Sequence, residues 1–112
     1  MIKIYLICAE IGGEKLHKIG YTKRTIEQRI KEFKTGNASD FYIVDSFQSK
    51  WGTKVESQLH KHFRHKKVNG EWFNLGDDDI VRFKELCKKI DSNFEMKMDT
   101  LIELYTKEKF IP

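Results

Sequence analysis

The sequence predicts a small α/β domain in which a three-stranded sheet, mixed or antiparallel, is flanked by helices and followed by a C-terminal helical extension. Three observations predict this class. Residues 2–9, 16–21 and 41–47 have the length and composition of strands. Residues 25–36 and 53–65 carry helix-start signals followed by apolar residues at helical spacing. With 112 residues, 39% of them hydrophobic, the chain can build one core but not two.

The first two strands are expected to form a β-hairpin. Ile2–Ala9 alternates weakly, as a mostly buried strand does, and the turn after it contains a pair of glycines. Leu16–Tyr21 is the returning strand. Gly20 within it indicates a backbone requirement, which is either a bulge or a close approach to the first helix.

Two capping-box patterns mark the starts of the next two helices. Thr25–Gln28 fits the first pattern, and its helix is expected to run to about Gly36, a residue type that often follows a helix. Thr53–Glu56 fits the second, and its helix is expected to end near His65. The third strand, residues 41–47, lies between the two helices.

The C-terminal third reads as helical. After an Asn-Gly turn and a short extended segment at 71–75, three aspartates at 77–79 favour the start of a third helix with a buried face through Ile90. A last helix is expected from about Phe94 to Lys107. The chain is thus divided into a core at 1–75 and an extension at 76–112 that packs on the core or forms a dimer face.

The distribution of charge indicates a polyanionic partner. The net charge is +4, but residues 1–75 carry 14 Lys and Arg against 8 Asp and Glu, which leaves +6, whereas residues 76–112 carry 7 against 9, which leaves −2. No apolar run is long enough to span a bilayer, so no membrane partner is expected. Two cysteines without metal-ligand or disulfide spacing, and a start unlike a signal peptide, favour a cytoplasmic location.

Five short segments carry polar residues in a recognisable order. The segments are Tyr5-Leu6-Ile7, Lys18-Ile19-Gly20-Tyr21-Thr22, Arg29, Glu56-Ser57-Gln58-Leu59-His60-Lys61-His62-Phe63 and Gly70-Glu71-Trp72-Phe73. Together they resemble the GIY-YIG nuclease superfamily, and more narrowly the branch of the T5orf172 domain, akin to the Mug113 domain. The resemblance covers residues 2–75, and Lys3 and Lys18 stand where the two name-giving motifs have glycine and tyrosine.

The resemblance implies a Mg²⁺-dependent endonuclease that hydrolyses DNA, with Mn²⁺ as a substitute. It implies Tyr5 near the attacking water, Arg29 on the phosphate and Glu56 on the metal. It also implies a supporting asparagine, for which Asn69 is the best match and Asn74 the second. These residue types suit the chemistry, because a scissile phosphate gains negative charge in the transition state. A lysine at 18 beside the tyrosine is expected to stabilise the phenolate and to lower its pKa.

Each of these residues also has a structural interpretation. Tyr5 can be a core aromatic of its strand, and Glu56 can complete the capping box of its helix. His60 lies one turn after Glu56 and is expected either to support that carboxylate or to be buried beside Trp72. Glu71 is expected to anchor the extended segment or, alternatively, to approach the metal.

Basic side chains on both sides of the proposed site are expected to contact nucleic acid phosphates, with no evident base-reading code. The alternative is a catalytically inactive nucleic-acid-binding module with the same fold and basic face. A separate specificity subunit or a homodimer is expected to supply selectivity, and the host cytoplasm is the expected location if a phage encodes the chain. The expected phosphate contacts are Lys23, Arg24, Lys54, Lys61, Arg64, Lys66 and Lys67.

Overall fold

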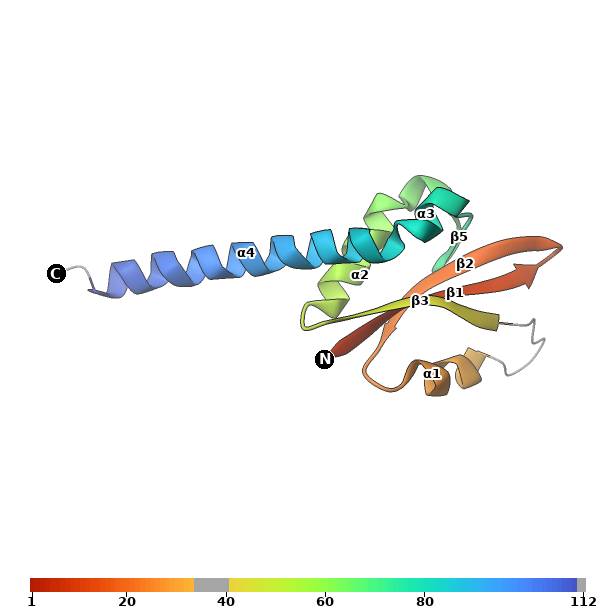
Figure 1. Ribbon diagram of the computed structural model, residues 1–112, viewed down its shortest axis with the longest axis horizontal. Helices are drawn as coiled ribbons and strands as arrows, with labels where there is room; N and C mark the ends of the chain where they lie inside the picture. The colour runs from red at the N-terminus through yellow and green to blue at the C-terminus, as the bar shows by residue number, and fades with distance from the viewer. Residues whose placement is uncertain (34–40, 111–112) are drawn as a thin grey trace.

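The computed structural model describes residues 1–33 and 41–110, and the side chains of 1–32 and 41–107 (Figure 1). Its regular elements follow the chain in the order strand, strand, helix, strand, helix, and then a short hairpin and two helices. They are β1 (Ile2–Ile11), β2 (Glu14–Thr22), α1 (Ile26–Phe33), β3 (Phe41–Ser49), α2 (Gly52–His62), a 3₁₀ turn (Arg64–Lys66), β4 (Lys67–Asn69), β5 (Trp72–Phe73), α3 (Asp77–Val81) and α4 (Phe83–Phe110).

The strands form one antiparallel sheet in the order β3-β1-β2-β5-β4. The antiparallel α/β class is therefore confirmed, but the predicted number of three strands is wrong in detail. A hairpin around Gly70, whose φ is +54°, adds β4 and β5 beside β2. With only three and two residues, these strands are too short to show a period in the sequence.

The pleat of the strands divides the core between two faces of the sheet. Ile4 and Leu6 point to the face covered by α2 and α4, where they join a cluster of ten buried residues that includes Phe83. Tyr5 and Ile7 point to the other face, where a cluster of four is completed by two isoleucines of α1. Successive residues thus serve opposite faces, as the period of a strand requires.

The first capping box is confirmed and the second is wrong. Thr25 Oγ1 accepts from the Gln28 N–H and Gln28 Oε1 accepts from the Thr25 N–H, both at 3.2 Å. In contrast, α2 begins earlier than expected, after Trp51, which provides no side-chain cap. Gly52 allows this start, since a Cβ there would lie 2.3 Å from Cγ2 of Ile2. Glu56 is therefore inside its helix and not at its end.

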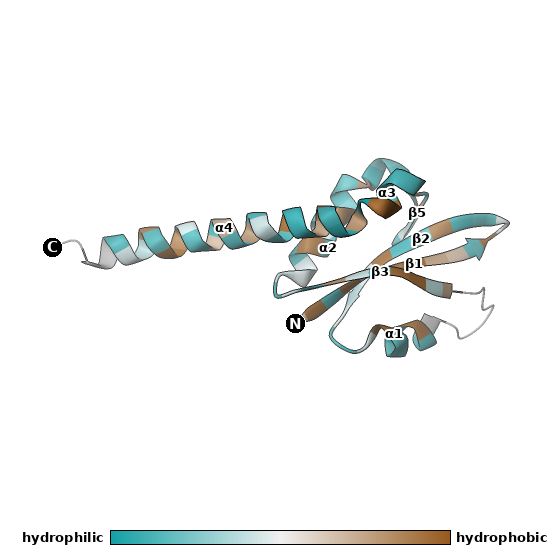
Figure 2. Ribbon diagram, viewed as in Figure 1, coloured by the Kyte–Doolittle hydropathy of each residue, from teal (hydrophilic) through white to brown (hydrophobic). Residues whose placement is uncertain are grey.

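The C-terminal helices are divided differently from the prediction. The break falls at Arg82, between α3 and α4, and α4 then runs without interruption for 28 residues. The polar residues 91–93 do not end the helix, because they include neither glycine nor proline. Figure 2 shows that apolar residues recur along the whole of α4. The expected end of α1 near Gly36 lies outside the described residues.

The first part of α4 belongs to the same core as the strands. Phe83 and Cys87 are fully buried in the cluster of ten, and Phe94 packs against it. The division into units 1–75 and 76–112 remains a prediction. Cys8 and Cys87 are both buried free thiols. None of the described helices combines the length and apolar composition needed to cross a bilayer.

Candidate active site

Tyr5 and Gly20 form a matched pair at the centre of the sheet. They are register partners on β1 and β2, and only 1% of the Tyr5 side chain is exposed. A Cβ at position 20 would lie 2.3 Å from the Tyr5 hydroxyl oxygen. The predicted close approach at Gly20 is therefore to the tyrosine ring and not to the first helix, so the glycine makes room for the phenol.

The Tyr5 hydroxyl meets the guanidinium of Arg29, which reaches it from α1, and the two side chains are hydrogen-bonded. Burial raises the pKa of Tyr5 above its ordinary value, and the hydrogen bond and charge of Arg29 offset this only in part. The expectation of a lowered pKa is therefore wrong in direction. Lys18 does not produce the expected effect, because its ammonium is paired elsewhere. The phenol stays protonated at neutral pH and can donate a hydrogen bond.

Arg29 is one of two guanidiniums held by a single carboxylate. Glu32, one turn further along α1, binds Arg29 through Oε2 at 2.5 Å and Arg24 through Oε1. These contacts raise the pKa of Arg29, chiefly through Glu32, and lower the pKa of Glu32, chiefly through Arg24. About a third of the Arg29 side chain is exposed (34%), so the guanidinium is accessible from solvent next to the buried phenol.

Glu56 reaches the site from the opposite side of the sheet, next to an open stretch of the β2 edge. His60 Nε2 lies 2.8 Å from Glu56 Oε1 and 2.8 Å from the carbonyl oxygen of Ile19. Because both neighbours are acceptors, Nε2 carries the proton. The hydrogen bond with Glu56 raises the pKa of His60 despite its partial burial. The His60 ring packs edge-on against Phe73 and not beside Trp72, so the first of its two expected roles, support of the carboxylate, fits.

The short strand β5 leaves part of the β2 edge open to α2. β5 pairs with His17 and Lys18 of β2, and the Ile19 N–H still donates to the Glu71 carbonyl at 3.2 Å. The carbonyl of Ile19 lies where that ladder ends and accepts from His60 instead. The sheet edge is thus open at this point, where Glu56 and His60 approach it.

Lys18 and Glu71 complete the cluster. Lys18 Nζ lies 3.2 Å from Glu71 Oε2 and 5.7 Å from the centre of the Trp72 ring. The negative charges of Glu71 and Glu56 both contribute to the raised pKa of Tyr5, which places the two carboxylates within electrostatic range of the phenol. Of the site residues named from the sequence, Tyr5 and Arg29 are therefore joined next to Gly20, and Glu56 and His60 are joined at the carbonyl of the neighbouring Ile19. Lys18 is paired with Glu71.

Asn69 lies further away along the sheet. It ends β4, the outermost strand, with an exposed side chain, and its register partner is Trp72. Two residues of turn separate it from Trp72, and Glu71 is one of them. The structure therefore places Asn69 two residues from Glu71 on the outermost hairpin, and Glu56 lies on α2.

The expected phosphate contacts fall into three groups with different surroundings. Lys23 and Arg24 lie exposed at the start of α1, next to Arg29. The second group begins with Lys61 in the last turn of α2 and continues through residues 64–67 after its end, where Lys66 is paired with Asp79. Lys54 lies over the rings of Trp51 and Phe94, at the contact between α2 and α4. The first group is the one that adjoins the Tyr5 cluster.

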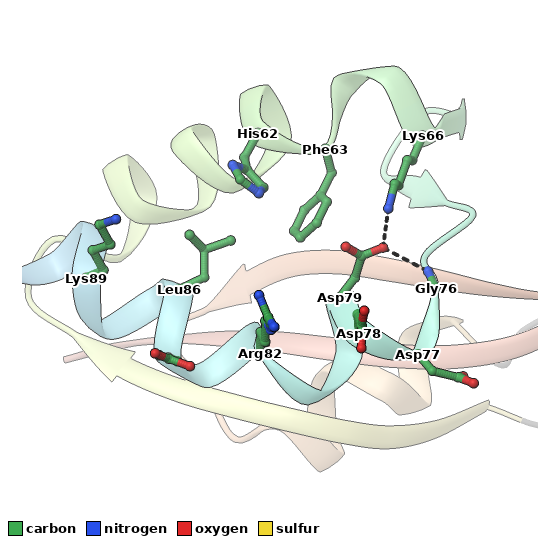
Figure 3. A pocket seen from close by; sticks show the side chains of 11 residues that line it. His62, Phe63, Lys66, Gly76, Asp77, Asp78, Asp79, Arg82, Leu86 and Lys89 are labelled. Carbon is green, nitrogen blue, oxygen red and sulfur yellow. Dashed lines mark hydrogen bonds and ion pairs between the residues drawn. The ribbon is translucent and has the colours of Figure 1, made fainter.

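A groove of about 1130 Å³ lies apart from this cluster, between the end of α2, α3 and the start of α4 (Figure 3). Its rim carries both signs of charge, with Asp77, Asp78 and Glu85 near Arg82 and Lys89. None of Tyr5, Arg29 or Glu56 lines it. The mixed charge gives the groove no preference for a polyanion, so it is not the candidate site.

Hard oxygen donors are available for a cation, but in small number. Glu56 presents a carboxylate whose contact among the described residues is with His60. In the part of the chain that the structure covers, no three His, Cys, Asp or Glu side chains are grouped to hold a metal ion. The donor set suits Mg²⁺, which accepts few protein ligands and retains water and substrate oxygens.

A small antiparallel α/β domain with a phenol, a guanidinium and a carboxylate around one sheet edge is suited to binding a phosphodiester. Comparison with known families agrees, since the family model of the T5orf172 domain matches residues 3–90. The chain belongs to the T5orf172 domain family, which indicates a nuclease-like or DNA-binding module and confirms the resemblance. No curated protein and no solved structure gives a significant match. The family match runs through α3 into α4, and the cluster of ten buried residues likewise includes residues of α4.

Two carboxylates near the site, Glu32 and Glu71, have partners that the sequence analysis does not identify. The spacing of Arg29 and Glu32 by three residues on one helix is the sequence signal for the first ion pair. The partner of Glu71 is Lys18. That pairing depends on the register of a two-residue strand, for which the sequence has no local signal.

Proposed function

We propose that the protein is a Mg²⁺-dependent endonuclease that hydrolyses DNA phosphodiester bonds. The observation that carries the proposal is that Tyr5 of β1 is hydrogen-bonded to Arg29 of α1 within the electrostatic range of Glu56 of α2. Tyr5 and Arg29, from two segments distant in sequence, thus supply a hydroxyl and a cation side by side, and the charge of Glu56 from a third segment acts on the same phenol. This combination supports the proposal.

Each side chain has a task that its surroundings permit. Arg29 can hold a non-bridging phosphate oxygen through its planar fork, after exchanging part of its contact with Glu32 for the phosphate. The protonated Tyr5 hydroxyl can donate to a phosphate oxygen or orient the attacking water. Glu56 would hold the metal ion, which when bound neutralises charge on the phosphate and activates water. His60 keeps the Glu56 carboxylate turned toward the sheet edge.

Cleavage of supercoiled plasmid with Mg²⁺ or Mn²⁺ tests this function. Glu56→Gln should lower the rate by at least about 100-fold, the scale of losing one group that stabilises transition-state charge. Affinity for the same DNA without metal should change little. Glu103→Gln, which makes the same chemical change on the exposed part of α4, should cleave like the parent.

A catalytically inactive nucleic-acid-binding module is the second candidate. Two observations favour it: the Glu56 carboxylate is already engaged by His60, and the buried Tyr5 has a raised pKa. DNA binding that weakens with salt, together with no cleavage by the parent under any metal, would establish this module and reject the hydrolase. Equal cleavage by the parent and Glu56→Gln would remove Glu56 from the mechanism.

A further inference from the structure

The buried stripe of α4 continues beyond the part of the molecule that covers it. Residues 83, 87, 90 and 94 are apolar and face the core, with spacings of four, three and four residues. The same pattern continues through Met98, Leu101 and Tyr105, again at spacings of four, three and four. One helix face is therefore apolar along its whole length.

Most of the second half of this stripe is exposed to solvent. Leu101 is 58% exposed and Tyr105 59%, and their neighbours Ile102 and Leu104 are exposed to a similar extent. The helix of 28 residues is about 42 Å long, and its C-terminal half extends away from the sheet and from the other helices (Figure 1). The exposed part is an apolar patch larger than scattered surface residues produce.

We propose that the segment 95–107 of α4 pairs side by side with the same segment of a second copy of this chain. The stripe has the alternating spacing of three and four residues with which helices pack against one another. It is continuous with the face that α4 already buries against α2 and β3. An isolated helical segment of this length is marginal in water, so a covering helix also stabilises the segment itself.

The charges of the segment favour a second copy of the same helix, and not a nucleic acid, as its binding partner. Residues 95–107 carry three carboxylates and two lysines, which leaves −1 and offers no basic surface to a polyanion. The signs are interspersed, so two copies do not repel strongly. Covering the exposed side chains on both copies removes on the order of 1,000 Å² of surface, near the lower bound of specific interfaces, so the expected dimer is a weak one.

The pairing is antiparallel, because a parallel pair would bring the two cores together at the same end. Residues 1–75 carry +6 in each copy, and like charges at close range oppose such an arrangement. In an antiparallel pair centred near Leu101, the cores lie at opposite ends and Met98 of one copy faces Tyr105 of the other. This arrangement leaves the Tyr5 site of each copy accessible.

Sedimentation velocity of nucleic-acid-free protein from about 1 to about 200 µM tests the pairing. The parent should shift from 13.3 kDa to twice that mass as concentration rises. Leu101→Glu should raise the dissociation constant at least about tenfold, since it buries two carboxylates in the interface. Met96→Glu is the matched control, because Met96 is 66% exposed on the opposite side of the same helix and should leave the dimer intact.

The remaining outcomes decide against the proposal. A parent that stays monomeric over the whole range, or that associates only when DNA is added, overturns it. So does a dimer that survives Leu101→Glu or is lost equally in Met96→Glu. Circular dichroism of both variants checks that the core is folded, which is expected because both positions lie beyond it.

Disulfide trapping decides the orientation. Oxidation of a mixture of Met98→Cys and Tyr105→Cys should give crosslinked dimers between the two variants, and either variant alone should give few. The native thiols of Cys8 and Cys87 are buried and do not compete. Efficient crosslinking of each variant with itself, and none in the mixture, would overturn the antiparallel arrangement.

Discussion

The two faces of the sheet are built from alternate residues of the same strands, yet they differ in size and in chemistry. The face under α2 and α4 buries ten residues, all of them apolar or cysteine. The face under α1 buries four, and one of these is Tyr5 with its hydroxyl on Arg29. The larger face therefore supplies most of the stability, while the smaller face can hold polar groups for binding. Substitutions on the larger face should therefore mainly lower stability, whereas substitutions on the smaller face should also affect binding.

The largest expected effect comes from truncating equivalent apolar residues on the two faces. Leu59→Ala removes a fully buried side chain from the cluster of ten and should lower the free energy of unfolding by about 4 kcal/mol. Ile30→Ala, at the partly open smaller face, should cost about 2 kcal/mol because its site can relax. Urea denaturation measures both, and equal costs would contradict the asymmetry.

Gly20→Ala changes the packing at the centre of the smaller face. The added methyl group meets the Tyr5 ring, and the expected loss is about 1–3 kcal/mol from overpacking. DNA binding and cleavage should fall together with stability, since the ring that moves carries the hydroxyl of the site. In a Tyr5→Leu background, where no ring reaches position 20, the cost of Gly20→Ala should shrink. A cost that is unchanged in that background would point to a backbone cause instead.

Tyr5→Phe separates the hydroxyl from the packing of the ring. The change should cost about 1 kcal/mol at neutral pH, the scale of one hydrogen bond. The folded pKa of Tyr5 is raised, so the stability from the neutral phenol is present below the unfolded pKa of about 10 and is lost as pH rises through the folded value. The variant should therefore lose less stability than the parent between neutral and strongly alkaline pH. Denaturation at both pH values measures this difference.

Asp79→Asn tests the smallest effect, away from both faces. Partial burial raises the pKa of Asp79, but bonds from Lys66 and from the Gly76 N–H outweigh it and leave the pKa lowered. The ionised form therefore stabilises the fold above the unfolded pKa, and this contribution is lost as pH falls through the folded value. Asn at this position should cost about 0.5–1 kcal/mol at pH 7, the scale of a helix cap, and less near pH 3. A cost independent of pH would exclude the ionic contribution.

Much of the architecture could be predicted because its signals are local. Thr25 and Gln28 indicate the start of a helix within four residues, and the pair of glycines indicates the turn of the first hairpin. Tyr5, Arg29 and Glu56 are indicated as site residues by the order of the five segments that resemble the family. The direction of the Tyr5 pKa could not be predicted, because it depends on how deeply the ring is buried and on where Lys18 finds its partner.

The period of a single element can be read from the sequence alone. It separates Tyr5 from Ile4 on β1 and places an apolar stripe along the length of α4. Folding adds the relations between elements: β5 stops beside Ile19, His60 binds the carbonyl there, and α4 extends beyond the elements that cover its first half. These features depend on where elements stop relative to one another, and no local pattern of residues encodes such relations.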